Sequence, residues 1–202
     1  MKDVAIAHFI VNPIFAYFVM YPLFKWRGAV ILDIESLPSV PTALFQILIF
    51  ILCEDTFFYW AHRLLHHRLI YRHIHKQHHQ FKSNIGVAAE YAHPIESLFG
   101  VFVPFALGPL IVRPHLLVLT FWMGLRVTEA VDAHSGFRFP FSPFQIIDHI
   151  QGGAERHEFH HSHNSGSYGS FTTFWDWVTG IFFHSFLFLF LFFSQFFFFS
   201  IF

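Results

Sequence analysis

The sequence has little charge and almost no cysteine. Only 12% of its 202 residues are charged, against 54% hydrophobic residues, which is too apolar for a typical soluble domain and favours a protein of the lipid bilayer. A formal net charge of -1 provides no broad basic field, so we expect no nucleic-acid partner. Cys53 is the single cysteine, which excludes an internal disulfide. Within its apolar run it is expected to be a small buried side chain.

The chain also lacks a linker rich in proline, glycine, serine or charge. We therefore expect one membrane domain over residues 1–180. Residues 181–202 are nearly all Phe, Leu, Ser and Ile, without the Trp, Tyr and basic anchors of a membrane span. They are interpreted either as a hydrophobic tail helix or as an unrelated end produced by splicing or an error in the gene structure.

Apolar stretches of about 20 residues, the length that crosses a bilayer as a helix, recur along the chain. The first lacks the basic start and small-residue cleavage site of a signal peptide, so it is expected to be a retained span. Two acids and two prolines make 33–41 a loop. The stretch 98–131 is interrupted by Pro104, Gly108, Pro109, Arg113 and Pro114, which predicts a hairpin of two short segments. The expected spans are 4–24, 42–61, the hairpin of 98–112 and 115–131, and 181–202.

Histidines are unusually frequent. There are 17 of them against 12 lysines and arginines, and imidazole is the commonest metal ligand in proteins. Helix positions i, i+3 and i+4 share one face, so each cluster is expected to be a convergent set of imidazoles. The chain must turn between residues 68 and 74 if the first two clusters share a site, because one straight helix would place them nearly opposite each other. The three clusters are His62 and His66; His75, His78 and His79; and His157, His160 and His161.

Eight clustered imidazoles are too many for one ion. Zinc sites usually use four ligands and other divalent ions rarely more than six, so two metal ions are predicted. Imidazole suits iron, zinc, copper and nickel alike. A site at the membrane face with no cysteine and no evident activator of a hydrolytic water favours redox chemistry, and therefore iron over zinc.

Further histidines separate into candidates and others. His134 is predicted to be a ninth ligand. For His93 two roles stay open, which are completing a metal site and capping the helix that follows. The histidines without partners at ligand spacing are not expected to bind metal; these are His8, His115, His149, His163 and His184.

An acid lies on the same helical stripe as the first histidine cluster. Asp55, Tyr59, His62 and His66 follow the spacing i, i+4, i+7, i+11. Because an acid inside an apolar span is costly and usually functional, Asp55, and with it Tyr59, is expected to accept or relay hydrogen bonds from the ligand histidines. The alternative is an interfacial pair of Asp55 with Glu54 beside a water-filled cavity.

The segment 62–82 indicates which side of the membrane the histidines face. It carries five basic residues and no acid, which predicts a cytosolic location. The hairpin is expected to return the chain to this side, because the third cluster can meet the others only there. The expected fold class is therefore all-α, with several membrane-spanning helices and a cytosol-facing helical cap that holds the histidine boxes.

Five ordered motifs carry a family resemblance. They resemble the fatty acid hydroxylase and sterol desaturase superfamily, and within it are most similar to the 4-methylsterol monooxygenases. The likeness extends over about residues 3–180. The motifs are 54–67 (EDTFFYWAHRLLHH), 75–81 (HKQHHQF), 90–96 (EYAHPIE), 132–136 (DAHSG) and 157–161 (HEFHH).

The resemblance implies a non-haem di-iron oxygenase of the endoplasmic reticulum membrane. It implies that molecular oxygen is the co-substrate and that electrons come from NAD(P)H through a b-type cytochrome and its reductase. The implied reaction oxidises a 4-methyl group of a sterol precursor stepwise to the carboxylic acid. The implied iron ligands are the eight clustered histidines together with His134.

Two departures from the family and three rival functions accompany this expectation. Relatives usually have more membrane sequence before this start and a polar, lysine-bearing tail after residue 180, which suggests a shortened isoform. The rivals are a lipid desaturase or other hydroxylase of the same superfamily, a metal transporter with ligands near the bilayer midplane, and an inactive or regulatory isoform. Trp122, Phe137 and Phe139 are hypothesised to line a flat sterol pocket.

Overall fold

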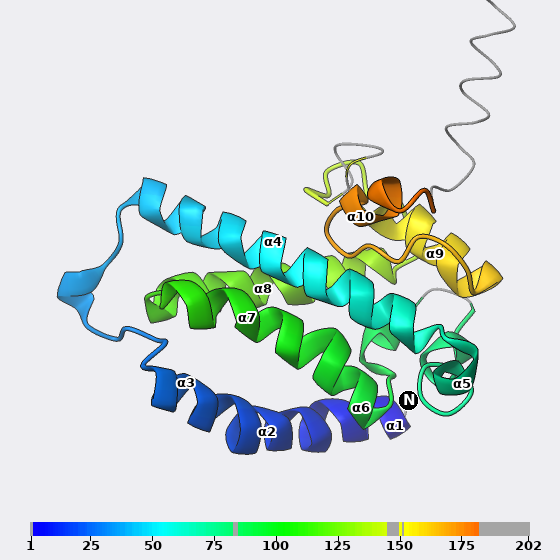
Figure 1. Ribbon diagram of the computed structural model, residues 1–202, viewed down its shortest axis with the longest axis horizontal. Coiled ribbons are helices and arrows are strands. Elements are labelled where there is room, and N and C mark those ends of the chain that lie inside the picture. Colours follow the sequence, from blue (N-terminus) through cyan, green and yellow to red (C-terminus); the bar gives the residue numbers. More distant parts are fainter. Residues whose placement is uncertain (1, 83–84, 145–149, 151, 182–202) are drawn as a thin grey trace, which may run out of the picture.

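The computed structural model describes residues 2–82, 85–144, 150 and 152–181, and their regular elements are helices (Figure 1). The all-α fold is thereby confirmed for these residues. Among them, Ile31 and His115 also form an isolated β-bridge. The predicted span 181–202 lies outside the described residues except for Ile181. The α-helices are α1 Lys2–Ile6, α2 Asn12–Phe15, α3 Tyr21–Arg27, α4 Val40–Leu65, α5 Arg68–Tyr71, α6 Pro94–Glu96, α7 Val103–Val112, α8 Leu116–Ala133, α9 Gly153–His163 and α10 Phe174–Val178.

Shorter helical segments connect several of these. The π-helical segments η1 Ala7–Val11 and η2 Ala16–Met20 join α1, α2 and α3 into one continuous rod. The rod ends at Gly28, whose φ of +58° is a left-handed conformation that glycine adopts readily. Its apolar part, Val4–Arg27, is long enough to cross a membrane, so the span expected over 4–24 is confirmed. The other segments are η3 Ile34–Ser36, η4 His78–Gln80, η5 Gly86–Glu90 and η6 Ser97–Phe102.

The second span is the 26-residue helix α4. The Ser39 hydroxyl caps it by accepting a hydrogen bond from the Thr42 N–H, and a proline occupies its first turn, where no N–H partner is needed. The predicted span 42–61 is confirmed, but α4 continues to Leu65. His62 is therefore part of the helix and His66 is its C-terminal cap.

The third span contains the predicted segment 98–112 and begins earlier than expected. Residues Pro94–Val112 form a continuous helical run through α6, η6 and α7 that is long and apolar enough to cross a membrane, so its prolines do not break it. Pro104 lies in the first turn of α7, directly after the π-helical segment η6, where a missing N–H costs little. Gly108 has a packing reason: a Cβ there would lie 2.7 Å from the Phe50 Cα, so glycine lets α7 approach α4 closely.

The expected hairpin is present, and its turn is tied to the neighbouring loop. α7 ends at Arg113, whose side chain donates hydrogen bonds to the carbonyls of Gly28 and Arg27 at 3.0 Å each. α8 then runs back for 18 residues. The hydrogen bonds of Arg113 therefore hold the end of α3 against the turn between α7 and α8.

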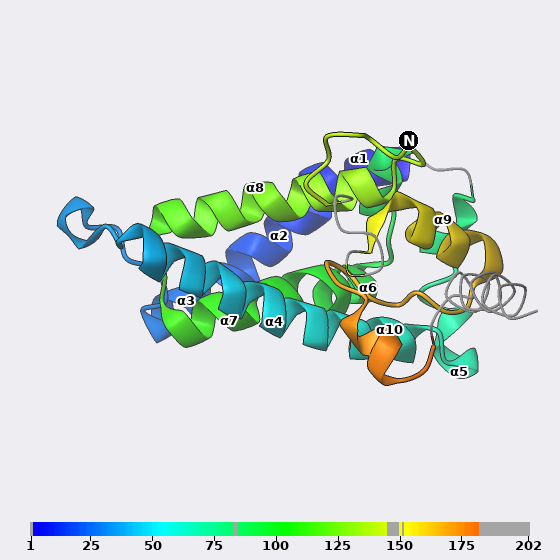
Figure 2. The same cartoon turned by 90° about the horizontal axis from the view of Figure 1, so that it is seen from above.

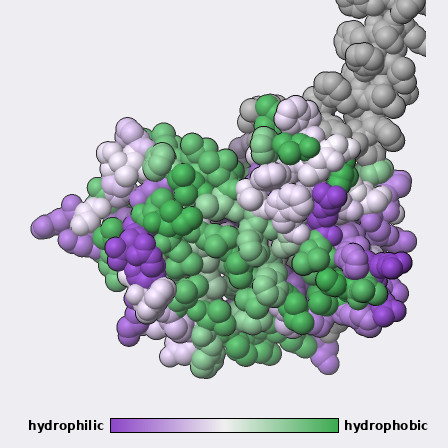
Figure 3. Space-filling view, viewed as in Figure 1, coloured by the Kyte–Doolittle hydropathy of each residue, from purple (hydrophilic) through white to green (hydrophobic). Residues whose placement is uncertain are grey.

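The surface fits a multi-pass membrane protein. Figure 3 shows an apolar band between two more polar ends, and three helices have the length and hydropathy of membrane spans. Between α4 and α8 a small core of Phe50, Val118 and Trp122 packs with Phe171. Lipid is as apolar as this core, so close packing rather than exclusion of water holds these helices together.

The helix ends place the histidine segments on one side of the bundle. Figures 1 and 2 show α5, α9 and α10 gathered where α4 and α8 end. α4 stops at Leu65, and α5 begins at Arg68 in a new direction. The predicted turn between the first two clusters is therefore present and begins slightly earlier than expected.

Candidate metal centre

All nine predicted histidines lie together at this end of the bundle. They form two groups, and within each group every residue offers a ring nitrogen within 4.8 Å of the others. We call these sets group one and group two. Group one contains His62, His66, His75, His79 and His160, and group two contains His78, His134, His157 and His161.

The two groups divide the histidine boxes in a way that differs from the expected convergent sets. His157 and His161, at i and i+4, belong to group two, whereas His160, at i+3, belongs to group one. On a helix, i+4 lies about 40° to one side of i and i+3 about 60° to the other. One helical turn therefore presents ligands to two neighbouring sites. The second box divides in the same manner, with His78 apart from its two neighbours.

In group one, the Nδ1 atoms of two histidines bond to oxygen atoms around the group, so their Nε2 atoms face each other without a proton. Nδ1 of His62 donates to the carbonyl of Tyr168 at 3.1 Å, and Nδ1 of His75 lies 2.8 Å from a Glu96 carboxylate oxygen. A carbonyl or carboxylate oxygen only accepts, so the proton of each neutral ring is on Nδ1. The Nε2 atoms of His62 and His75 face each other at 3.1 Å with lone pairs and no proton between them.

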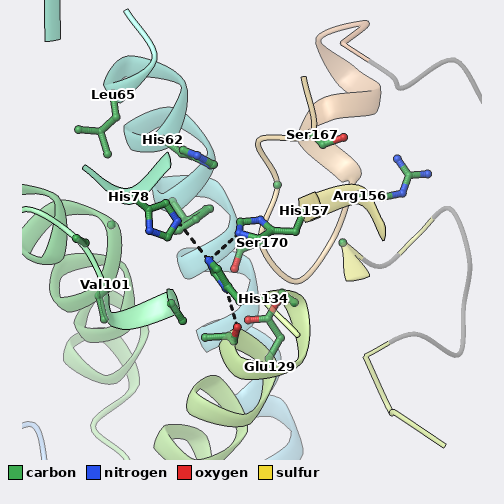
Figure 4. A pocket seen from close by; sticks show the side chains of 18 of the residues that line it. His62, Leu65, His78, Val101, Glu129, His134, Arg156, His157, Ser167 and Ser170 are labelled. Atoms are coloured by element: carbon green, nitrogen blue, oxygen red, sulfur yellow. Dashed lines mark hydrogen bonds between the residues drawn. The ribbon is translucent and has the colours of Figure 1, made fainter. Parts of the chain in front are cut away.

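Group two repeats this arrangement with other partners. Nδ1 of His134 donates to the Ala130 carbonyl at 2.8 Å, and Nδ1 of His78 to the Tyr91 carbonyl at 3.3 Å. Their Nε2 atoms lie 3.3 Å apart, and Nε2 of His157 is 2.8 Å from Nε2 of His134 (Figure 4). Unprotonated Nε2 atoms therefore converge in this group as well.

A metal cation fits both groups. Two unprotonated imidazole nitrogens at such distances repel each other unless a cation lies between them. Metal–nitrogen bonds of about 2.1 Å place neighbouring ligand atoms about 3.0 Å apart at right angles and about 3.4 Å apart in a tetrahedron. The observed Nε2 separations, from 2.8 to 3.3 Å, match the edges of such a polyhedron.

Burial keeps these histidines neutral. It lowers the pKa of His79 to about 3 and that of His66 to about 4, and it does the same in group two for His134, at about 3, and His161, at about 4. Because an imidazole binds metal only when it is unprotonated, the ligands need no deprotonation at neutral pH.

Glu96 is a partner of the site that the histidine spacing alone does not reveal. Its carboxylate is 7% exposed and pairs with His75, and its second oxygen has no hydrogen-bond partner among the described residues. Glu96 follows His75 by 21 residues, so no helical spacing connects the two. Its place at the end of the motif EYAHPIE is the signal that could have indicated it.

Asp55, Tyr59 and His93 lie outside the two groups. The Asp55 carboxylate accepts hydrogen bonds from the N–H and the hydroxyl of Thr172, and the Tyr59 hydroxyl bonds to that of Thr179 at 2.5 Å. Both partners differ from the histidines expected from the sequence. His93 caps α6, because its ring nitrogen accepts the Ile95 N–H at 3.2 Å.

Three of the histidines that were not expected to bind metal lie apart from the two groups. His8, His115 and His163 lie outside both groups. His115 caps α8 by accepting the Leu117 N–H at 3.1 Å. His149 and His184 lie outside the described residues.

A cavity of about 100 Å³ adjoins both groups. Part of its wall is apolar, and part is made by Arg126 and Glu129 of α8 (Figure 4). The Arg126 guanidinium pairs with the carboxylates of Glu129 and of Glu54 on α4, so three charged side chains neutralise one another in part beneath the histidines.

The aromatic residues hypothesised to line a sterol pocket are elsewhere. Trp122 is fully buried in the core of the bundle, and Phe137 and Phe139 are 67% and 49% exposed. None of the three lines the cavity beside the histidines. Side chains such as Phe58, Leu65 and Val101 form its apolar wall instead.

Comparison with known proteins identifies the same region. Residues 47–181 match the family model described as fatty acid hydroxylase. The chain is similar to very-long-chain aldehyde decarbonylase GL1-8 of Oryza sativa subsp. indica, at 42% identity over 163 residues, which are 79% of this chain and 59% of the relative. It is also similar to methylsterol monooxygenase 2-2 of Arabidopsis thaliana, at 40% identity, with 79% and 60% covered. The aligned region therefore spans about three fifths of the length of these relatives, and no solved structure matches the chain.

Proposed function

The chain belongs to the fatty acid hydroxylase family, and we propose that it is a membrane oxygenase that oxidises a 4-methyl group of a sterol precursor stepwise to the carboxylate. The proposed cofactor is a pair of non-haem iron ions, one in each histidine group. Molecular oxygen is the co-substrate, and NAD(P)H supplies electrons through its reductase and a b-type cytochrome. The similarity to methylsterol monooxygenases supports the choice of substrate.

One observation carries the proposal of two ions. Each group contains a pair of Nε2 atoms whose protons are held on the opposite side of the ring, His62 with His75 in one and His78 with His134 in the other. Each pair needs its own cation. Nine imidazoles without cysteine suit iron, and the family favours iron over zinc.

The chemistry requires a strong oxidant, which the metal pair supplies when oxygen and electrons are present. Each hydroxylation converts a methyl group, O₂, two electrons and two protons into an alcohol and water. Oxygen partners fix the tautomers of His62, His75, His78 and His134, and the apolar wall of the cavity aims the substrate. A buried, largely apolar wall also excludes bulk water from the reacting carbon.

We propose that the metal end faces the cytosol at the endoplasmic reticulum. Five basic side chains at this end are exposed, and positive charge is typical of the cytosolic side of a membrane protein. This orientation places the site where soluble NAD(P)H-dependent reductase domains operate. The five are Arg63, Arg68, Arg72, Lys76 and Lys82.

Reconstitution tests the proposal. The full chain, loaded with iron in lipid vesicles, is incubated with a 4,4-dimethylsterol, oxygen, NAD(P)H, the cytochrome and its reductase, and the products are analysed by mass spectrometry. We expect the alcohol, aldehyde and acid at the 4-methyl carbon. An alkene would assign a desaturase instead. Turnover that appears only when a full-length relative is added would assign a regulatory isoform.

A second candidate comes from the aldehyde decarbonylase relatives, which cover the same share of the chain at 42% identity. In this alternative the substrate is a very-long-chain aldehyde, and the product is a hydrocarbon shorter by one carbon. The same vesicles incubated with a long-chain aldehyde distinguish the two, because the hydrocarbon would form in place of sterol acids.

A further inference from the structure

We infer that Asp55 and Asp176 are positioning residues of the metal centre, which hold a loop whose backbone oxygens orient two histidines of group one. We name residues 164–173 the carbonyl loop. The inference rests on the proposed function in one respect, that group one binds a metal ion. It goes further by assigning a role to two acids that touch no ligand directly.

The carbonyl loop is the common partner of histidines from two helices. The Tyr168 carbonyl accepts a hydrogen bond from Nδ1 of His62 at 3.1 Å, and the Gly166 carbonyl accepts one from Nδ1 of His160 at 2.7 Å. Two of the five rings in group one therefore take their tautomer and orientation from one short loop.

Asp176 holds the same peptide group that orients His62. Its Oδ2 accepts the Gly169 N–H at 3.0 Å, and its Oδ1 accepts the Tyr168 N–H at 2.9 Å. The Gly169 N–H and the Tyr168 carbonyl belong to one rigid peptide plane. A carboxylate that is 2% exposed thus fixes one edge of this plane while the imidazole bonds to the other.

Asp55 fixes the other end of the loop to α4. Its carboxylate, 6% exposed, accepts both the N–H and the hydroxyl of Thr172. Asp55 precedes His62 by seven residues, so it lies about two turns before it on the same helical stripe. The helix that supplies His62 and His66 thereby also anchors the loop that orients them.

The loop conformation is one that needs anchoring. Ser167 has a left-handed φ of +53°, which costs a non-glycine residue about 1–3 kcal/mol and persists only where neighbours enforce it. A Cβ at Gly169 would lie 2.2 Å from the Thr172 carbonyl oxygen, so only glycine fits there. Asp176 holds the backbone directly after Ser167, and Asp55 holds it at Thr172.

Group two takes its outer partners elsewhere. His134 bonds to the Ala130 carbonyl within its own helix, and His78 bonds to the Tyr91 carbonyl. Loosening of the carbonyl loop should therefore affect group one selectively. A purely structural role for the acids would weaken both groups together.

The experiment is a titration with cobalt(II) alone on the full chain, purified in detergent and stripped of metal. The variants are Asp176→Asn and Asp55→Asn, and the matched control is Asp33→Asn, which removes the acid that caps η3 at the far end. We expect two bound equivalents for the unaltered chain and the control. The variants should keep one tight site and bind the second ion tenfold to a hundredfold more weakly. With two equivalents of cobalt added at a protein concentration between the two dissociation constants, they should show about half of the cobalt–imidazole absorption of the unaltered chain.

The possible results separate the inference from the proposed function. Two equivalents with unchanged affinity and spectrum in both variants would overturn the inference alone, as would equal weakening of both sites. Fewer than two equivalents in the unaltered chain would overturn the two-ion proposal. If either aspartate variant fails to fold, Thr172→Val against Thr172→Ser decides, since only the serine keeps the hydroxyl that bonds to Asp55: the valine variant should lose the second equivalent and the serine variant should keep it.

Discussion

Group one and group two present the same atom type, the imidazole nitrogen, but the two groups are supported by different parts of the chain. In group two, His134 is oriented by the Ala130 carbonyl of its own helix, one turn earlier. In group one, His62 and His160 depend on a loop that follows α9, and His75 depends on the Glu96 carboxylate of α6. Group two therefore relies more on local helix geometry, and group one on contacts between distant segments.

This difference suggests that the two sites respond differently to change. Helix geometry is set by adjacent residues and survives distant substitutions, whereas a loop contact is lost when any of its anchors is removed. Substitutions away from the ligands should accordingly weaken metal binding in group one before group two.

The largest effect should come from removing one ligand in each group. We expect His62→Ala and His157→Ala each to lower the proposed sterol oxidation by at least about a hundredfold, since removing a ligand should cost no less than removing the residue that orients it. Iron content measured by plasma mass spectrometry should fall toward one per chain in both. Two irons in either variant would contradict the assignment of that residue as a ligand.

Glu96→Gln should have the next largest effect. The amide oxygen can still accept the proton of His75 Nδ1, but the negative charge that strengthens this bond is lost. Metal affinity at group one should fall by about tenfold to a hundredfold, with group two unchanged. The exposed Glu35→Gln at the far end serves as the control, and equal loss of both ions would argue against a role restricted to group one.

The stability of the metal-free chain should depend on pH to a similar extent through both groups. His79 and His134 have pKa values of about 3 when folded, against about 6.5 for an unfolded histidine. Between these values the unfolded chain binds more protons than the folded chain, so stability falls as pH is lowered from 7 toward 4. Thermal unfolding in detergent with a chelator measures this decrease, and a midpoint independent of pH would contradict the burial of neutral rings.

The smallest effect is expected from Ser167→Gly. Glycine adopts the left-handed φ of +53° without the steric cost that serine pays, and the buried Ser167 hydroxyl has no hydrogen-bond partner among the described residues to lose. The folded state should gain about 1 kcal/mol, measured by thermal unfolding, while cobalt affinity at both groups changes less than about threefold. A large loss of affinity at group one would mean that the hydroxyl itself supports the loop.

Much of this architecture could be predicted because helices are local. The spans from Val4 and through α4, the turn after the first cluster and the assembly of nine histidines follow from hydropathy and spacing, and the family resemblance is confirmed. The segment 98–112 was predicted, but its earlier start, the π-helical segment η6 and the packing of Gly108 against α4 were not, because they depend on tertiary contacts.

The supporting residues were harder to find. Glu96, Asp176 and the carbonyls of Gly166 and Tyr168 act across gaps in sequence that no periodicity connects. Asp55 was identified by its cost in an apolar helix, but its partner Thr172 lies 117 residues away. Such pairs are set by tertiary packing, so sequence indicates which residues need a partner but not which partner they take.

The placement of α9 has a consequence for the order in which the sites can form during synthesis. Four of the five histidines of group one have been translated by residue 79, and all four precede the third span. Group two has only His78 and His134 until α9 leaves the ribosome with both of its remaining members. An ion can therefore find a partial site in the nascent chain at group one long before the second one has three ligands.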